Sequence, residues 1–214
     1  MRQRLTEIYE RLFQHFGPQD WWPGETSFEV CVGAILTQNT SWQNVKKAID
    51  NLKAADILSS HAMFRMSESS LAELIRPAGY YNIKANRLKA FITFLTQEFR
   101  GDLDAMFKTP LEELRNRLLS IRGIGPETAD SILLYGGRLP TFVVDAYTLR
   151  ALSRHGLIFE DATYEDVRGM FMDNLPIDVQ LYNEFHALWV ALGKRYCKKT
   201  RPLCSGCPLF DSKQ

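Results

Sequence analysis

The stretch LLSIRGIGPETAD at residues 118–130 joins two helical patterns across a very short connection. Leucines recur at helical spacing from Leu111 toward this stretch, and a second helical pattern continues beyond it until Gly136. Between the two, Gly123 and Gly125 permit a sharp turn whose backbone can approach another molecule closely, because glycine carries no Cβ atom. The start of the second helix also presents unpaired backbone N–H groups, which attract anions. Taken alone, the pattern fits a plain helix–helix loop as well as a phosphate-binding turn.

Helical spacing of apolar residues continues along most of the chain, and no stretch predicts a convincing sheet. Three capping boxes, in which an N-cap hydroxyl and a residue three positions later bond each other's backbone N–H groups, are expected at Thr26, Thr40 and Thr109. We count about ten helices by this spacing and predict an all-α protein.

The composition is that of an ordinary soluble globular protein, with 45% hydrophobic and 24% charged residues among 214. A net charge of +1 does not by itself indicate a nucleic-acid binder, so basic residues are judged locally. Lys84, close to Arg87 and Lys89, is a candidate phosphate contact. No apolar run approaches the length of a membrane span, and residues 1–4 lack the core of a signal peptide. We therefore expect a cytoplasmic protein without a membrane partner.

Three of the four cysteines, Cys197, Cys204 and Cys207, are crowded into eleven residues near the C-terminus. In a reducing cytoplasm such crowding favours a metal site over disulfides. The four histidines are scattered at positions 15, 61, 155 and 186 and show neither metal-ligand spacing nor a nucleophile triad.

The stretch at 118–130, followed by FVVD at 142–145, resembles the helix-hairpin-helix of the endonuclease III superfamily of DNA glycosylases. In that family the loop grips a DNA phosphate without reading sequence. The resemblance implies that Gly123, Gly125 and Thr128 contact the DNA backbone.

Because the resemblance covers nearly the whole chain, it also implies the domain organisation. A helical barrel lobe at 25–136 would contain the hairpin, and residues 1–24 with 137–214 would form a second helical lobe with the cysteine loop. We expect a cleft between the two lobes.

By its place after the hairpin, Asp145 matches the family's essential aspartate, although an aspartate there is also a good helix N-cap and both roles can hold. A carboxylate can stabilise an oxocarbenium-like sugar and orient or deprotonate the attacking water. Glu127 stands where bifunctional members carry a lysine that forms a Schiff base with the sugar. Since a carboxylate cannot form that imine, we expect a monofunctional enzyme without AP-lyase activity.

Three further segments, WWP at 21–23, LTQNT at 36–40 and RPAGYYN at 76–82, resemble the 3-methyladenine glycosylase branch, in which aromatic rings hold a flipped base. Aromatic residues are usually core, but these lie in a loop or near a helix start. Alkylated purines can be cationic, and indole faces attract cations. Gln38 would fill the gap left by the flipped base. The residues expected to line the base pocket are Trp21, Trp22, Pro23, Trp42 and Glu127.

The spacing C-x6-C-x2-C resembles the start of the family's iron–sulfur loop, which expects a fourth cysteine where this chain has Lys213. We expect a 4Fe-4S cluster held by Cys197, Cys204 and Cys207, although such clusters normally take four thiolates. Bound zinc and the absence of any metal are the alternatives.

Together these features predict a base-excision DNA glycosylase that removes alkylated purines, of the 3-methyladenine kind, from damaged double-stranded DNA. It would flip the base and hydrolyse its N-glycosidic bond. The alternatives are a glycosylase for another lesion, such as an oxidised pyrimidine or a mismatch, and a non-catalytic module that grips the DNA backbone. We expect a monomer, associated with the nucleoid if the source is a prokaryote.

Overall fold

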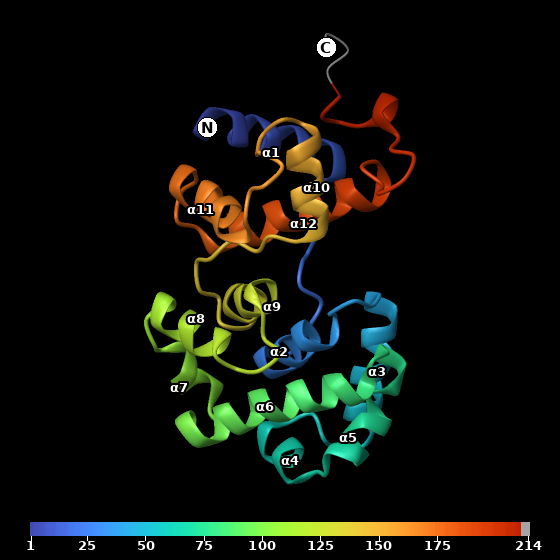
Figure 1. The fold of residues 1–214 in the computed structure, drawn as a ribbon, viewed down its shortest axis with the longest axis vertical. Coiled ribbons are helices and arrows are strands. Elements are labelled where there is room, and N and C mark those ends of the chain that lie inside the picture. The colour runs from blue at the N-terminus through green and yellow to red at the C-terminus, as the bar shows by residue number, and fades with distance from the viewer. Residues whose placement is uncertain (211–214) are drawn as a thin grey trace. The chain divides into compact units, whose positions relative to one another are not determined.

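The computed structural model describes residues 1–210, and every regular element within that range is a helix (Figure 1). The predicted all-α class is confirmed. The chain folds into two compact units, a central unit formed by Pro23–Leu139 and a terminal unit formed by Met1–Trp22 with the chain from Pro140 onward. None of the described helices is long and apolar enough to cross a membrane.

The elements divide between the units as follows. The central unit contains α2 (Ser27–Leu36), α3 (Trp42–Ala54), α4 (Ser60–Arg65), α5 (Glu68–Leu74), η1 (Arg76–Ala78), α6 (Tyr81–Phe99), α7 (Leu103–Phe107), α8 (Leu111–Leu119), α9 (Pro126–Ser131) and the π-helical η2 (Ile132–Gly136). The terminal unit contains α1 (Arg2–Phe16), α10 (Ala146–Arg154), α11 (Tyr164–Asn174), α12 (Val179–Arg195) and η3 (Cys204–Gly206).

Helix α2 is the buried centre of the central unit, because its sequence is apolar on nearly every side. All residues from Glu29 to Leu36 are buried, and the helix contacts α3, α6, α9 and η2. Burying one Val, Leu or Ile side chain stabilises a fold by about 1.5–3 kcal/mol. The loop at 37–41 therefore begins at the end of a helix that is fixed in place by its packing.

Helices α8 and α9 form the hairpin expected from the sequence. Gly123 in the turn has φ +92°, a conformation that L side chains rarely adopt. The Ile124 side chain is buried beside it. A buried ion pair joins the two helices, with Arg115 Nε and Nη2 donating to the Asp130 carboxylate at 2.9 and 3.0 Å. Removing one partner of a buried pair typically costs about 3–5 kcal/mol, so the pair holds the hairpin as one element.

None of the three expected capping boxes is completed by the described residues. Helix α8 begins one residue later than predicted, with Pro110 as an N-cap that makes no side-chain bond. Helix α3 likewise has no side-chain cap, and the Thr40 hydroxyl instead accepts a hydrogen bond from Asn44. At α2, Thr26 does accept the Glu29 N–H at 3.1 Å, but the Glu29 carboxylate accepts from the backbone one residue before Thr26.

Helix α12 is the buried centre of the terminal unit and contacts α1 and α10. Gly193 on α12 makes room for Tyr147 of α10, since an added Cβ atom would lie 2.3 Å from the Tyr147 ring. Phe142, on the buried segment 141–144, stacks on Phe171 with ring centroids 3.8 Å apart. This packing fixes the end of the segment, and hence the start of α10.

Candidate functional site

Asp145 is the N-cap of α10 and is 9% exposed. Its Oδ1 accepts hydrogen bonds from the Thr148 backbone N–H at 2.7 Å and from the Thr148 hydroxyl at 2.8 Å. Its Oδ2 lies 3.6 Å from Nε2 of His186 on α12. One carboxylate oxygen is thus used to cap the helix, and the other faces a histidine.

The surroundings of Asp145 keep it ionised. Burial by itself would raise its pKa, because a low-dielectric environment disfavours the charged form. The neighbouring His186 and the Thr148 donors act in the opposite direction and outweigh burial, so the pKa of Asp145 lies below its usual value. No spacing in the sequence pointed to His186, which lies 41 residues further along the chain.

Gln38, in the loop after α2, is tied to the turn of the hairpin. Its Nε2 donates to the Gly123 carbonyl at 3.1 Å and to the Thr128 hydroxyl at 2.8 Å. Its Oε1 accepts a hydrogen bond from Nη1 of Arg87 on α6. The central unit therefore brings together three residues expected to contact DNA, Gln38, Gly123 and Thr128.

The two glycines of the turn have different surroundings. Arg87 packs across Gly123, where an added Cβ atom would lie 2.4 Å from the Arg87 Cγ. Gly125 is exposed, and no atom lies within 4 Å of where its Cβ would be. Gly123 is needed for packing within the protein, whereas Gly125 leaves the turn open to an approaching molecule.

The predicted DNA contact of Lys84 is wrong in this structure. Lys84 is 1% exposed, and its ammonium donates to the carbonyls of Leu36 at 2.9 Å and Ala78 at 2.8 Å. Burial, followed by the nearby Arg87 charge, lowers the pKa of Lys84 to about 8. A lysine enclosed in this way cannot reach a phosphate or a sugar. It instead ties the end of α2 to η1.

Trp21 and Trp22 are half-buried in the terminal unit, with ring centroids 5.4 Å apart. The Trp21 ring also lies 6.3 Å from the His186 ring and 5.7 Å from the Lys194 ammonium. Trp21 therefore packs between Trp22 and the histidine beside Asp145. Trp42 belongs to the central unit, and the assembly of all the expected pocket residues stays a prediction.

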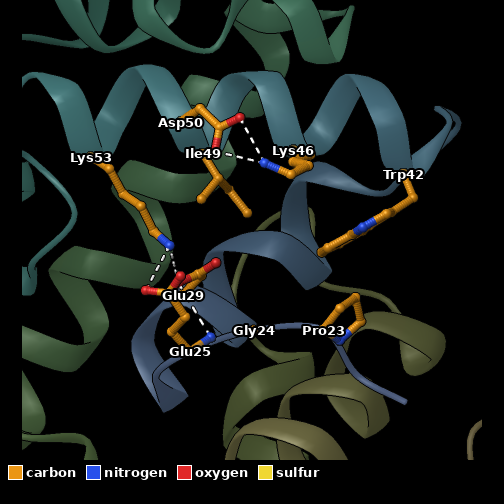
Figure 2. A pocket seen from close by; sticks show the side chains of 9 residues that line it. All are labelled: Pro23, Gly24, Glu25, Glu29, Trp42, Lys46, Ile49, Asp50 and Lys53. Carbon is orange, nitrogen blue, oxygen red and sulfur yellow. Dashed lines mark hydrogen bonds and ion pairs between the residues drawn. The ribbon is translucent and has the colours of Figure 1, made fainter. Parts of the chain in front are cut away.

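Trp42 borders a hollow of about 280 Å³ in the central unit (Figure 2). The Trp42 indole and Pro23 lie at one end of it, and the Lys53 ammonium with its carboxylate partners lies at the other. Lys53 pairs with Glu29 at 2.9 Å and with Glu25 at 3.0 Å, and these bonds raise its pKa. The full lining is Pro23, Gly24, Glu25, Glu29, Trp42, Lys46, Ile49, Asp50 and Lys53.

Glu127 is exposed in the first turn of α9. Negative charge is favoured at this end of a helix by the aligned peptide dipoles. The position therefore carries an accessible carboxylate and no amine.

The cysteine loop is anchored to the helices of the terminal unit by arginines. Arg150 donates to the Cys197 carbonyl at 2.7 Å, and Arg154 lies 3.4 Å from the Cys197 sulfur. Burial raises the pKa of Cys207, and the nearby Cys197 and Cys204 add to this effect. Within residues 1–210 no three metal-ligating side chains are arranged as a ligand set. The expected fourth position, Lys213, lies outside the described residues.

A helical hairpin with an open glycine turn, followed by a buried carboxylate at the next helix start, defines the class of helix-hairpin-helix DNA-repair proteins. Residues 32–176 match the family described as HhH-GPD superfamily base excision DNA repair protein, and the chain belongs to this superfamily. The resemblance seen in the sequence is thereby confirmed.

Relatives and solved structures agree with this assignment. A predicted DNA repair glycosylase of Methanocaldococcus jannaschii is 49% identical over 98% of this chain and 95% of its own length. The 3-methyladenine DNA glycosylase of H. pylori, solved with 1,N6-ethenoadenine, is 30% identical, with a TM-score of 0.76 over 89% of this chain and 97% of that one. An endonuclease III–DNA complex has a TM-score of 0.82 at 20% identity over 97% of this chain and 92% of that one, which shows the shared fold.

Proposed function

We propose that this DNA glycosylase is monofunctional and removes alkylated purines. The observation that carries base release is the geometry of Asp145, whose Oδ1 is held by Thr148 while Oδ2 faces His186, and the absence of a lyase step rests on Glu127 in place of a lysine. As the C1′–N bond breaks, its electrons leave with the base, and the carboxylate stabilises the cationic sugar. Water then bonds to C1′ and loses its proton to the carboxylate, which leaves an abasic site.

The choice of substrate rests on the aromatic residues and on one relative. Trp21 and Trp22 precede Pro23, and Trp42 borders a hollow whose carboxylates are paired with Lys46 and Lys53, so the indole faces are the groups that suit a cationic base. The 30% identical H. pylori protein is a 3-methyladenine glycosylase. We infer that a methylated purine is the preferred class, that damaged double-stranded DNA is the partner, and that the protein acts as a monomer.

The test is a panel of duplexes that each carry one defined lesion. Base release would be measured from methylated duplex, ethenoadenine, an oxidised pyrimidine and a T·G mismatch. We expect release from the alkylated purines well above that from the other two. Preference for an oxidised pyrimidine would instead support the second candidate, favoured by the 28% identical endonuclease III of Sulfolobus acidocaldarius. If the protein bound these duplexes but released no base from any of them, it would be a non-catalytic module that binds the DNA backbone.

The cysteine loop is our candidate for a metal site, with a 4Fe-4S cluster as the expected occupant. Its support is the spacing of three thiols and the guanidinium of Arg154, which lies 3.4 Å from the Cys197 sulfur. The described residues do not complete a ligand set, so no step of the reaction is assigned to the loop. Protein purified without oxygen should contain iron and inorganic sulfide. Zinc alone, or no metal, would contradict the cluster.

A further inference from the structure

The second carboxylate oxygen of Asp145 has a buried neighbour that base-excision chemistry does not itself require. His186 on α12 places its Nε2 3.6 Å from Oδ2, and its side chain is 5% exposed. At this distance a hydrogen-bonding contact with the imidazole and the charge of the imidazole both lower the pKa of Asp145.

We propose that His186 is a positioning residue that controls how much negative charge Asp145 presents to the reacting sugar. A neutral imidazole leaves the Oδ2 charge available to the cation that develops at C1′. A protonated imidazole forms an ion pair with Oδ2, which cancels much of that charge and adds a repulsive cation nearby. This inference rests on the proposed role of Asp145 in base release.

The other groups around the pair do not perform this role. Thr148 on α10 is a neutral donor to the opposite oxygen. Lys194 on α12 lies over the Trp21 ring, 5.7 Å from its centroid, and is not among the groups that shift the pKa of Asp145. Glu184 on α12 accepts the Gln19 backbone N–H at 2.8 Å and interacts with Asp20. Only His186 and Thr148 oppose the effect of burial on the Asp145 carboxyl.

The dependence of the base-release rate on pH below 8 distinguishes protonation of Asp145 from an effect of His186. Because the pKa of Asp145 lies below its ordinary value near 4, its own protonation cannot reduce the rate above about pH 5. Imidazoles change charge between about pH 5 and 8. A loss of activity in that interval that is absent from His186→Gln would therefore report the histidine.

The experiment is single-turnover base release from methylated duplex between pH 5 and 8.5. Under this proposal the wild-type rate should fall by about tenfold or more from pH 8 to pH 5. His186→Gln should lose this pH dependence, its rate staying within about threefold across the range. His61→Gln, an exposed histidine on α4, is the control and should keep the wild-type profile. If His186 had only a structural role, the base-release rate of the variant would be lower by the same factor at every pH, and its pH profile would keep the wild-type shape.

Two measurements keep the proposal testable if His186→Gln folds poorly or the substrate class is wrong. If the wild-type base-release rate did not change with pH above pH 5, the proposal would be overturned without any variant. The Asp145 carboxyl can also be titrated by ¹³C NMR in the absence of DNA. Its pKa should rise in His186→Gln, because His186 lowers it in the wild type, and an unchanged titration would contradict the pairing. If the lesion panel shows no base release, the proposed function fails while this titration still decides whether the pair exists.

Discussion

At the scale of single residues, the helix cap made by Asp145 and its proposed role in base release can be separated. Replacing Asp145 with Asn should retain the helix cap, because an amide oxygen also accepts the Thr148 N–H. The charge that stabilises the cationic sugar is lost. We expect single-turnover base release to fall by about 10²–10³, with duplex binding and melting temperature nearly unchanged.

Asp178 provides the matched control for this change. It caps α12 in the same unit by accepting the Leu181 N–H at 3.0 Å, and it is exposed. Asp178→Asn should leave base release unaltered. If Asp145→Asn also released base within a few-fold of wild type, Asp145 would be a cap only.

Trp42 is the residue where a pocket role and a packing role can be separated. Its ring borders the hollow and also packs against the core of the central unit. Trp42→Leu keeps apolar bulk but removes the ring, so release of methylated purine should fall by roughly 5–100-fold, the equivalent of 1–3 kcal/mol of base stacking. The melting temperature should change little, as in the control Phe64→Leu on α4. A variant destabilised by about 3–5 kcal/mol with normal activity per folded molecule would show that Trp42 is core.

At the scale of the helical hairpin, the two glycines lead to opposite expectations. Gly125→Ala meets no atom of the protein, so its melting temperature should match wild type. A methyl group on the open face of the turn should block a backbone bond to phosphate, and such charge-assisted bonds contribute about 1.5–3 kcal/mol. Binding to damaged and undamaged duplex should weaken alike, by about ten- to a hundredfold.

Gly123→Ala should act on stability instead. Its φ of +92° is unfavourable for alanine, and the new Cβ would displace Arg87. We expect a loss of at least about 1–2 kcal/mol, measured by denaturant unfolding. Selective loss of binding to damaged DNA in either glycine variant would contradict the assignment of the turn to phosphate.

At the scale of the whole molecule, base release and strand cutting should be uncoupled. The exposed position in the first turn of α9 carries Glu127, and the buried Lys84 is committed to two carbonyls. Product strands should therefore break only after alkali or heat, and borohydride should trap no covalent adduct at a level that matches turnover. Glu127→Lys supplies an amine at the position of the family's lysine and is expected to give a trapped adduct. Efficient trapping by the wild type would disprove the monofunctional proposal.

Features that depend on short spacings could be read from the amino-acid sequence. Periodic apolar residues predicted an all-α protein, and the glycine turn at 123–125 predicted the hairpin, because both are local properties of the backbone. The Asp145 cap was likewise predictable from its place before a helical pattern. Local signals were less reliable at Thr40 and Thr109. The Thr40 hydroxyl accepts a hydrogen bond from the Asn44 side chain in place of a backbone N–H. At Thr109 the helix starts one residue later, with Pro110 as its N-cap.

Which distant side chains meet could be seen only once the helices were packed in the tertiary structure. It buried Lys84, which the sequence suggested for DNA, because packing of α6 against α2 and η1 encloses its ammonium between two carbonyls. It joined Gln38 to a turn 85 residues away, and it set His186 beside Asp145. The physical reason is the same in each case. A helix is specified by neighbours three and four residues apart, whereas the partner of a buried charge is specified by which helices pack together.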